Sequence, residues 1–417
     1  MKKTISLLLA CIMIIGLAGC ASTAATTTSV TTKSAAGTSA TTSAAAGTSA
    51  TTVKSGVSGD PVKIGLGTVL TGDRALEGKY ATNIVKIVEQ EINDAGGVLG
   101  RPLKIVVQDS LGTDIGAVNA YRKLAEDKNI VAIIGSDSSN DNLATAADAK
   151  KLQIPTVGQG SSPKLNTEAL QNPWLFQLRA VDATLCTALM KYAVEKLKFK
   201  KFAIIHDTET ASADQARLFT EALKAQGITP VITVPFTTGT KDFTSHLVQI
   251  QKMDVDAIVA ASFGTEAAVL VQQIRSIGME KMPVFGSNVY ADPIVIALAK
   301  EAMNGVYCAT HWVPTTPNPK GKAIAAKYKT LYKEDLGKAG AQVYDHVYIL
   351  CEAIKRAGST DRTKVRDAMN TIVDYQGAMT TYDISTNGDC GRGGLLVQVV
   401  NQQANVLGEI SAGPKKK

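Results

Sequence analysis

From Pro61 onward, short apolar runs alternate with longer stretches in which apolar and polar residues follow a helical period. Apolar runs of this length predict buried strands, and the stretches between them predict amphipathic helices. In the first half of the chain this pattern predicts strands at 62–69, 103–109, 130–135 and 154–158, and helices at 78–95, 114–128 and 140–151. Strict alternation of strand and helix is typical of a parallel sheet with helices on both faces.

The helix predicted over 78–95 shows the pattern most clearly. One of its faces carries the apolar side chains of Tyr80, Ile84, Ile87, Val88 and Ile92. Residues three and four apart lie on one side of a helix, so this face is expected to pack on the sheet.

The alternation restarts after residue 180. It predicts strands at 201–207, 228–236, 255–262, 282–287 and 305–312, with helices at 212–226, 242–252, 265–277 and 292–303. Residues 318–370 are expected to be mainly helical, and residues 394–411 to form a closing hairpin of strands. The fold class is therefore α/β, with two Rossmann-like lobes built on parallel sheets. In open sheets of this kind, ligands bind outside the carboxyl ends of the strands.

The N-terminal segment has the features of a processing signal. Lys2 and Lys3 precede an apolar stretch at 5–19, which ends in small residues before Cys20. This stretch is short for a membrane span of about 20 residues. We expect residues 1–19 to be a signal peptide and Cys20 to carry lipid; the alternative is an ordinary signal peptide with a coincidental cysteine. Residues 20–59 are rich in Ala, Ser and Thr and are expected to be a flexible tether.

Composition narrows the possible functions. The 417 residues carry a formal net charge of +7, but five of the lysines lie at the two ends of the chain. The sequence lacks a basic stripe with interleaved aromatics, so nucleic acid is not an expected partner. The cysteines lack metal-ligand spacing, so we expect neither a metal site nor a cofactor. Cys186 and Cys351 lie in apolar helical patterns and are expected to be buried thiols; pairing among Cys186, Cys308, Cys351 and Cys390 stays open.

Two predicted strands end in small hydroxyl residues. Ser138 and Ser139 follow the strand at 130–135, and Ser161 and Ser162 follow the strand at 154–158. Serine favours the helix N-cap, where free N–H groups attract an anion. Neighbouring ends of this kind would hold one carboxylate between them. The alternative is that these serines only cap helices.

Catalytic motifs are missing from the sequence. None of His206, His246, His311 and His346 has metal spacing, and neither a nucleophile elbow nor a phosphate-binding lysine motif occurs. Asp207 follows His206 at a polar strand end, but no third group completes an acid–base couple. We therefore do not expect an enzyme.

Several segments resemble the branched-chain amino-acid binding proteins of ABC transporters, which have the type I periplasmic binding fold. "INDAGGVLGRPLKIVVQD" at 92–109 carries most of the resemblance, and "GSDSSN", "GQGSSP", "AIIHD", "IRSIG" and "YDHVYILCEAIKRAGS" follow in family order. The resemblance implies two lobes that close by a hinge of three crossovers, near residues 180, 313 and 378. One lobe would span 60–180 and be completed by 313–378; the other would span 181–312 and be completed by 379–412.

The resemblance also implies ligand-binding residues. A carboxylate would be held by Ser138, Ser139, Gly160, Ser161 and Ser162, and Phe263 would cover an apolar ligand side chain.

Other positions depart from the family pattern. Asn288 replaces an acid that pairs with the ligand ammonium, Thr210 lies where a tyrosine is frequent, and Glu77 replaces an aromatic. Because a buried ammonium needs a partner, Glu77, Asp207 or Asp292 would have to supply the charge, or the ligand is not an α-amino acid.

These observations predict an extracytoplasmic, lipid-anchored and monomeric binding protein. It would take a small carboxylate ligand, first of all a branched-chain or other hydrophobic amino acid, and deliver it to an ABC permease and its ATPases. Two alternatives stay open: a receptor for a non-amino carboxylate, such as an aromatic or short-chain acid, and a sensor that reports ligand to a signalling partner.

Overall fold

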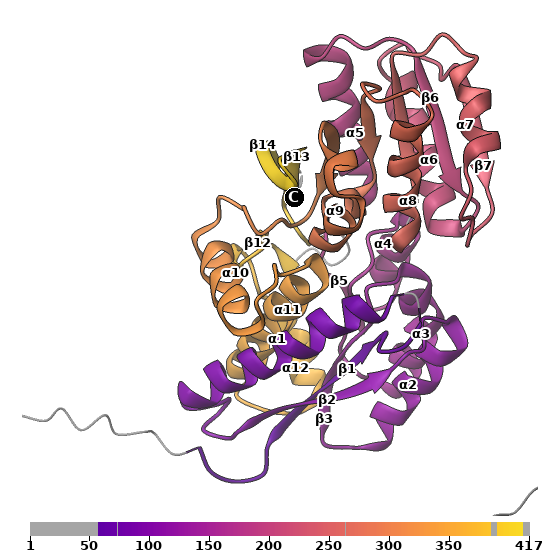
Figure 1. The fold of residues 1–417 in the computed structure, drawn as a ribbon. Helices are drawn as coiled ribbons and strands as arrows, with labels where there is room; N and C mark the ends of the chain where they lie inside the picture. The colour runs from indigo at the N-terminus through magenta and orange to yellow at the C-terminus, as the bar shows by residue number, and fades with distance from the viewer. Residues whose placement is uncertain (1–56, 73, 263, 385–389, 412–417) are drawn as a thin grey trace, which may run out of the picture. The chain divides into compact units, whose positions relative to one another are not determined.

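Two separate sheets organise the chain in the computed structural model, which describes residues 57–72, 74–262, 264–384 and 390–411 (Figure 1). Contacts place these residues in one unit, Lys54–Lys417. The predicted signal peptide, Cys20 and most of the predicted tether lie outside the described residues.

The first sheet has five parallel strands in the order β2-β1-β3-β4-β5. Its strands are β1 (Val62–Thr68), β2 (Leu103–Asp109), β3 (Ile130–Ile134), β4 (Thr156–Gly158) and β5 (Leu175–Gln177). The helices between them are α1 (Ala75–Asp94), α2 (Asp114–Glu126), α3 (Ser139–Leu152) and α4 (Pro163–Gln171). Helix α4 was not predicted, because its buried side is limited to Leu165 and Ala169, too few for a periodic signal.

The second sheet has the order β14-β13-β10-β9-β8-β6-β7. Its strands are β6 (Phe202–Asp207), β7 (Ile232–Phe236), β8 (Ala257–Ala261), β9 (Val284–Gly286), β10 (Val306–Thr310), β13 (Gly393–Val400) and β14 (Gln403–Ser411). All neighbouring strands are parallel except β10 with β13 and β13 with β14, which confirms the predicted closing hairpin. The helices of this region are α5 (Asp182–Lys191), α6 (Thr210–Lys224), α7 (Thr244–Gln251), α8 (Gly264–Ser276) and α9 (Pro293–Ala299), with short turns at Tyr192–Lys196, Asn288–Ala291 and Lys300–Met303. The predicted α/β class with two parallel-sheet lobes is confirmed.

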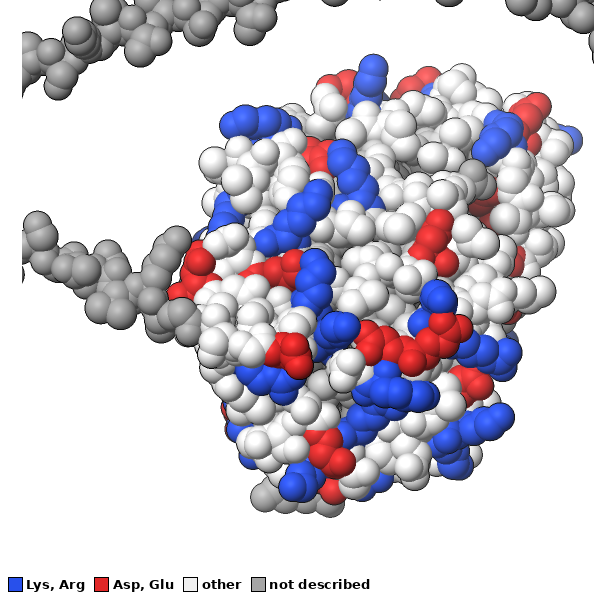
Figure 2. All heavy atoms as spheres, turned by 90° about the horizontal axis from the view of Figure 1, so that it is seen from below, with Lys and Arg blue, Asp and Glu red and all other residues white. Residues whose placement is uncertain are grey.

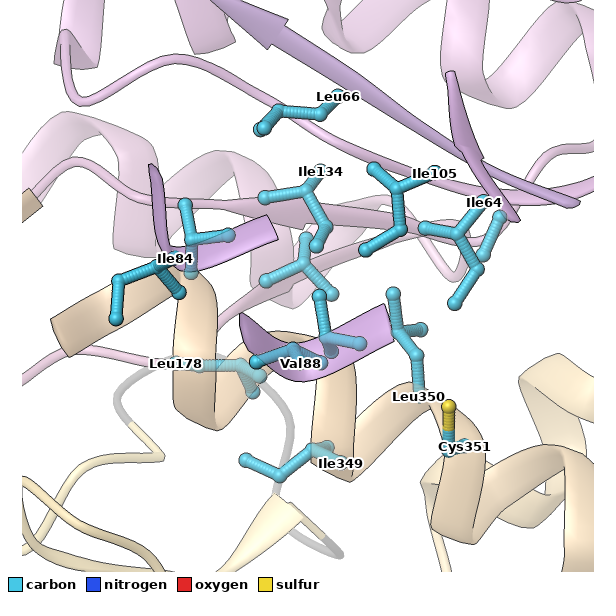
Figure 3. Packing of buried hydrophobic residues seen from close by; sticks show 14 of the residues in the cluster. Ile64, Leu66, Ile84, Val88, Ile105, Ile134, Leu178, Ile349, Leu350 and Cys351 are labelled. Carbon is cyan, nitrogen blue, oxygen red and sulfur yellow. The ribbon is translucent and has the colours of Figure 1, made fainter. Parts of the chain in front are cut away.

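Helices from late in the chain pack on the first sheet. They are α10 (Pro319–Tyr332), α11 (Lys338–Ala357) and α12 (Arg362–Met369), and they are followed by a small pair of strands, β11 (Tyr375–Gln376) and β12 (Thr381–Tyr382). In the core that Figure 3 shows, Leu350 and Cys351 of α11 lie with Val88 of α1 and Ile64 of β1. This burial of apolar surface joins the C-terminal helices to the N-terminal sheet.

The apolar pattern of the sequence corresponds closely to the core. Tyr80, Ile84, Ile87, Val88 and Ile92 of α1 are all buried, as predicted. Cys186 and Cys351 are buried free thiols, which confirms the prediction for these two.

Buried residues also bear on where the chain returns to the second sheet. Met379, Tyr382 and Cys390 are buried with the core of the first sheet. The crossover near residue 378, where the chain is expected to pass to the second lobe, stays a prediction.

The outer surface has mixed charge. Figure 2 shows acidic and basic side chains interspersed over the face seen from below. Among the described residues, no helix is long and apolar enough to cross a membrane.

Candidate functional site

Strand register brings the two serine pairs together. Strands β3 and β4 are parallel, with Ile133 opposite Thr156 and Ile134 opposite Val157. Their carboxyl ends therefore lie at one edge of the first sheet. The Oγ atom of Ser139 accepts hydrogen bonds from the backbone N–H groups of Ser161 and Ser162, both at 3.2 Å. Two consecutive N–H groups thus converge on one oxygen atom.

Gly160 allows this close approach. A Cβ atom at this position would lie 2.4 Å from Oγ and 2.7 Å from Cα of Ser139. Such distances are far below van der Waals contact, so any larger residue would push the two strand ends apart.

The remaining serines divide between capping and contact with a cation. Ser138 caps α3 by accepting a bond from the N–H of Asp141 at 3.3 Å, and Ser162 caps α4 by accepting one from Lys164 at 3.2 Å. The hydroxyl of Ser161 instead accepts a bond from the guanidinium of Arg179. The hydroxyls of Ser138 and Ser162 therefore have the capping role, while those of Ser139 and Ser161 face other partners.

A cluster of buried charges lies beside this turn. The carboxylate of Asp137 is 2.9 Å from Arg179, 3.1 Å from Lys338 and 3.7 Å from Arg74. Burial alone would raise the pKa of Asp137, but Lys338, Arg179 and Arg74 outweigh it and hold this pKa below its usual value. Burial lowers the pKa of Lys338, and Asp137 opposes that change. Three cations therefore surround the carboxylate of Asp137 beside the turn.

Glu77 and Asp292 lie near the same cations. Glu77 is 3.8 Å from Arg74, and burial raises its pKa to about 7 although Arg74 opposes the shift. Asp292 caps α9 by accepting a bond from the N–H of Ile294 at 3.2 Å. Burial raises the pKa of Asp292, against the opposing effect of that bond and of Lys338.

Hydrogen bonds continue from this cluster to the second sheet. Lys338 donates to Oδ1 of Asn288 at 3.5 Å, and Asn288 donates to Oδ1 of Asp182 at 3.4 Å. The backbone N–H of Asp182 donates to the carbonyl of Ser161 at 3.0 Å. Asn140 of α3 and Glu209, at the start of α6, add a further link at 3.1 Å. The strand ends of the two sheets therefore meet in one polar network.

Asp207 bonds to the chain segments that follow its own strand and the neighbouring strand β7. Its Oδ1 accepts bonds from the N–H of Glu209 at 2.8 Å and the hydroxyl of Thr238 at 2.6 Å. Burial, together with the nearby Asp207, raises the pKa of Glu266 to about 7. Asp207 thus holds the loop that follows β7 and is not brought together with Ser139 and Ser161.

Two predicted contacts have no described side chain. Thr210 begins α6, but its side chain is outside what the structure describes, as is the whole of Phe263. Their predicted roles stay predictions. Within the described residues, no group of three or more His, Cys, Asp or Glu side chains is arranged to hold a metal ion.

Sequence reasoning missed four charged residues of the network: Arg74, Asp137, Arg179 and Lys338. It also missed Asp182. The available signal was a charge inside a mostly apolar stretch, as for Arg179 and Asp182 in "WLFQLRAVD". Charged residues are seldom fully buried unless they are paired, so such a position predicts a partner from another part of the chain.

Two α/β sheets whose polar strand ends meet in one network define the architecture of two-lobed ligand-binding proteins. A family model described as periplasmic binding protein matches residues 61–404, and the chain belongs to this family. A leucine-, isoleucine-, valine-, threonine- and alanine-binding protein of Pseudomonas aeruginosa is 24% identical over 315 residues, which cover 75% of this chain and 83% of that protein.

Solved structures have the same fold. A leucine binding protein from Thermotoga maritima has a TM-score of 0.77 at 25% identity, over 84% of this chain and 99% of that chain. A solute binding protein of an ABC transporter from R. palustris, solved with benzoate, has a TM-score of 0.76 at 20% identity, over 84% of this chain and 97% of that chain. The fold is thus shared by proteins whose ligands differ.

Proposed function

We propose that this protein captures a small carboxylate ligand, first of all a branched-chain or other hydrophobic amino acid, and delivers it to an ABC importer. The observation that carries the proposal is the pair of N–H groups at Ser161 and Ser162, which converge on the single oxygen of Ser139. A carboxylate oxygen would take the place of that hydroxyl oxygen, and the Ser139 hydroxyl would rotate to donate a bond to the ligand. Hydrogen bonds of this kind to a charged group contribute about 1.5–3 kcal/mol each.

A cation beside the turn supports the same ligand class. The guanidinium of Arg179 donates a hydrogen bond to the hydroxyl of Ser161, so it lies next to the N–H groups that would hold a carboxylate. A low local dielectric strengthens the attraction between this cation and an anion that enters the site.

A non-amino carboxylate is the second candidate. The observation that favours it is Asn288, an amide where related amino-acid binders usually carry an acid. The R. palustris relative solved with benzoate is an example of such a ligand within the fold.

Binding calorimetry separates the two candidates. The purified protein would be unfolded in guanidinium and refolded to remove bound ligand, then titrated with leucine, valine and phenylalanine and with their deaminated acids. Tight binding of the amino acids supports the first candidate, and binding of the deaminated acids alone supports the second. If neither the amino acids nor the deaminated acids bind, the proposed ligand class is wrong.

We also propose that the protein is held at the outer face of a membrane by lipid on Cys20. The motif at the end of the apolar N-terminal stretch supports this. Cell fractionation of a Cys20→Ser variant tests it: the variant is expected in the soluble fraction, and continued membrane attachment would contradict the lipid anchor.

A further inference from the structure

We propose that Glu209 is a positioning residue that joins the two lobes when they close on a ligand, and that Lys164 and Asp214 add a weaker contact of the same kind. This inference rests on the proposed function. It concerns side chains that set ligand affinity from outside the candidate carboxylate site.

Burial of the candidate site shows why contacts between the lobes bear on affinity. Ser161 and Ser162, whose N–H groups would hold the carboxylate, are 3% and 7% exposed. Asn288, which reaches the same network from the second lobe, is also buried. A ligand therefore reaches this turn only when the strand ends of the two sheets move apart. Any contact that forms between the lobes as they close again stabilises the ligand-bound state.

Glu209 lies between the N-termini of two helices from different lobes (Figure 1). Its Oε2 atom accepts a hydrogen bond from the N–H of Ala211 at 3.0 Å and so caps α6. Its Oε1 atom accepts one from the side-chain amide of Asn140, the second residue of α3, at 3.1 Å. Helix N-termini attract negative charge, because their free N–H groups and the helix dipole are positive there. One carboxylate thus contacts helices on both sides of the junction.

The bond between Asn140 and Glu209 is linked to the candidate carboxylate site through the backbone. Asn140 follows Ser139, and the Oγ atom of Ser139 accepts bonds from the N–H groups of Ser161 and Ser162. A shift of Ser139 when a ligand binds therefore also moves Asn140. Glu209 would then respond to the ligand without touching it.

A second pair on α6 has the same arrangement. Nζ of Lys164, on α4, lies 3.4 Å from Oδ2 of Asp214, on α6. The backbone N–H of Lys164 donates to the hydroxyl of Ser162, so this residue also adjoins the candidate turn. The side chain of Lys164 is 60% exposed, and solvent screens such a pair. Its effect on affinity is expected to be the smaller of the two.

Calorimetry on the isosteric variant Asn140→Asp tests the role of Glu209. The probe is leucine, or its deaminated analogue 4-methylpentanoate if the wild-type protein binds that acid and not leucine. The change sets a second carboxylate against Glu209, and repulsion between like charges should weaken binding of the probe at least about tenfold. The midpoint of urea unfolding should stay near that of the wild type, because an acidic side chain is favourable in the first turn of α3.

Two further variants separate this role from a general effect of added charge. Asn119→Asp makes the same change at an exposed position of α2 and should alter affinity less than about twofold. The double variant Asn140→Asp with Glu209→Gln exchanges donor and acceptor. The glutamine oxygen can still cap α6 while its amide donates to the new carboxylate, so affinity should return to within about threefold of the wild type.

The pair of Lys164 and Asp214 has its own test. Lys164→Met should weaken binding of the probe about threefold at low salt. The difference from the wild type should disappear at about 0.5 M salt, because exposed charges are screened there. Equal affinity of the two proteins at low salt would overturn the role of this pair.

The outcomes distinguish the inference from the proposed function. If the wild-type protein binds the probe and Asn140→Asp binds it equally well, or the double variant does not recover, the role of Glu209 is wrong and the proposed function stands. If the wild-type protein binds neither amino acids nor deaminated acids, the proposed function is wrong. Small-angle X-ray scattering of the ligand-free proteins then decides the role of Glu209. A larger radius of gyration in Asn140→Asp that the double variant reverses supports it, and equal radii overturn it.

Discussion

The strand ends of the first sheet and those of the second bring different groups to their junction. At the first, the N–H groups of Ser161 and Ser162 lie beside the buried ion pair of Asp137 and Arg179. At the second, the group that reaches the same network from the end of β9 is the uncharged amide of Asn288, which both accepts and donates a hydrogen bond. Two regions built on the same strand–helix plan thus differ in charge where they meet.

Removal of Arg179 is expected to have the largest effect. The variant Arg179→Met deprives Asp137 of a cation at 2.9 Å in a site where both side chains are under 10% exposed. Breaking a buried pair from one side typically lowers the free energy of unfolding by about 3–5 kcal/mol. Urea unfolding measures this loss of stability. In the matched control Arg122→Met, the lost pair with Asp148 is exposed on the arginine side, and a change below about 1 kcal/mol is expected. Equal small losses in both variants would show that the buried ion pair of Asp137 and Arg179 contributes little to stability.

A methyl group at Gly160 should separate the two strand ends. Because the added Cβ would meet Cα of Ser139 at 2.7 Å, Gly160→Ala should destabilise the turn by about 1–3 kcal/mol and weaken carboxylate binding about tenfold. The control is Gly408→Ala, where an added Cβ meets nothing within 4 Å. Calorimetry measures ligand affinity and urea unfolding measures stability for both variants. Unchanged ligand affinity in Gly160→Ala would show that the turn is not part of the binding site.

Serine substitutions distinguish binding from capping. Ser161→Ala should weaken ligand binding by about 1–2 kcal/mol if its hydroxyl bonds a carboxylate. Ser138→Ala removes the cap of α3 and should lower stability by about 0.5–2 kcal/mol. Calorimetry together with thermal unfolding separates the two. If Ser161→Ala lowers stability and leaves ligand affinity unchanged, the Ser161 hydroxyl has a structural role and not a binding role.

The smallest expected effect is a dependence of stability on pH. Because burial raises the pKa of Glu77 to about 7, the folded protein binds a proton at Glu77 that the unfolded chain releases near pH 4. The folded state then binds more protons between these two values, so the contribution of Glu77 to stability falls as pH rises from about 4 to 7 and is level above. The difference in unfolding midpoint between wild type and Glu77→Gln should therefore change over this range, and a constant difference would contradict the shift.

The fold could be predicted from the sequence more fully than the site. Strands and amphipathic helices leave a local, periodic signal, as the buried face of α1 illustrates. The meeting of Ser139 with Ser161 and Ser162 could also be anticipated, because parallel strands end at one edge.

The charged side chains beside these serines could not be predicted from the sequence. Arg179, Lys338 and Asp137 come from separate parts of the chain, and their contact depends on how α11 packs on the first sheet. The direction of the Asp207 side chain could not be anticipated either, because its hydrogen bonds to Glu209 and Thr238 depend on how the loops after β6 and β7 fold. Its predicted role in ligand binding stays a prediction.

The most direct measurement is a crystal structure of the protein with leucine bound. The account predicts the ligand carboxylate within hydrogen-bond distance of the N–H groups of Ser161 and Ser162. A ligand in the reverse orientation, or one bound away from the Ser161 turn, would contradict it.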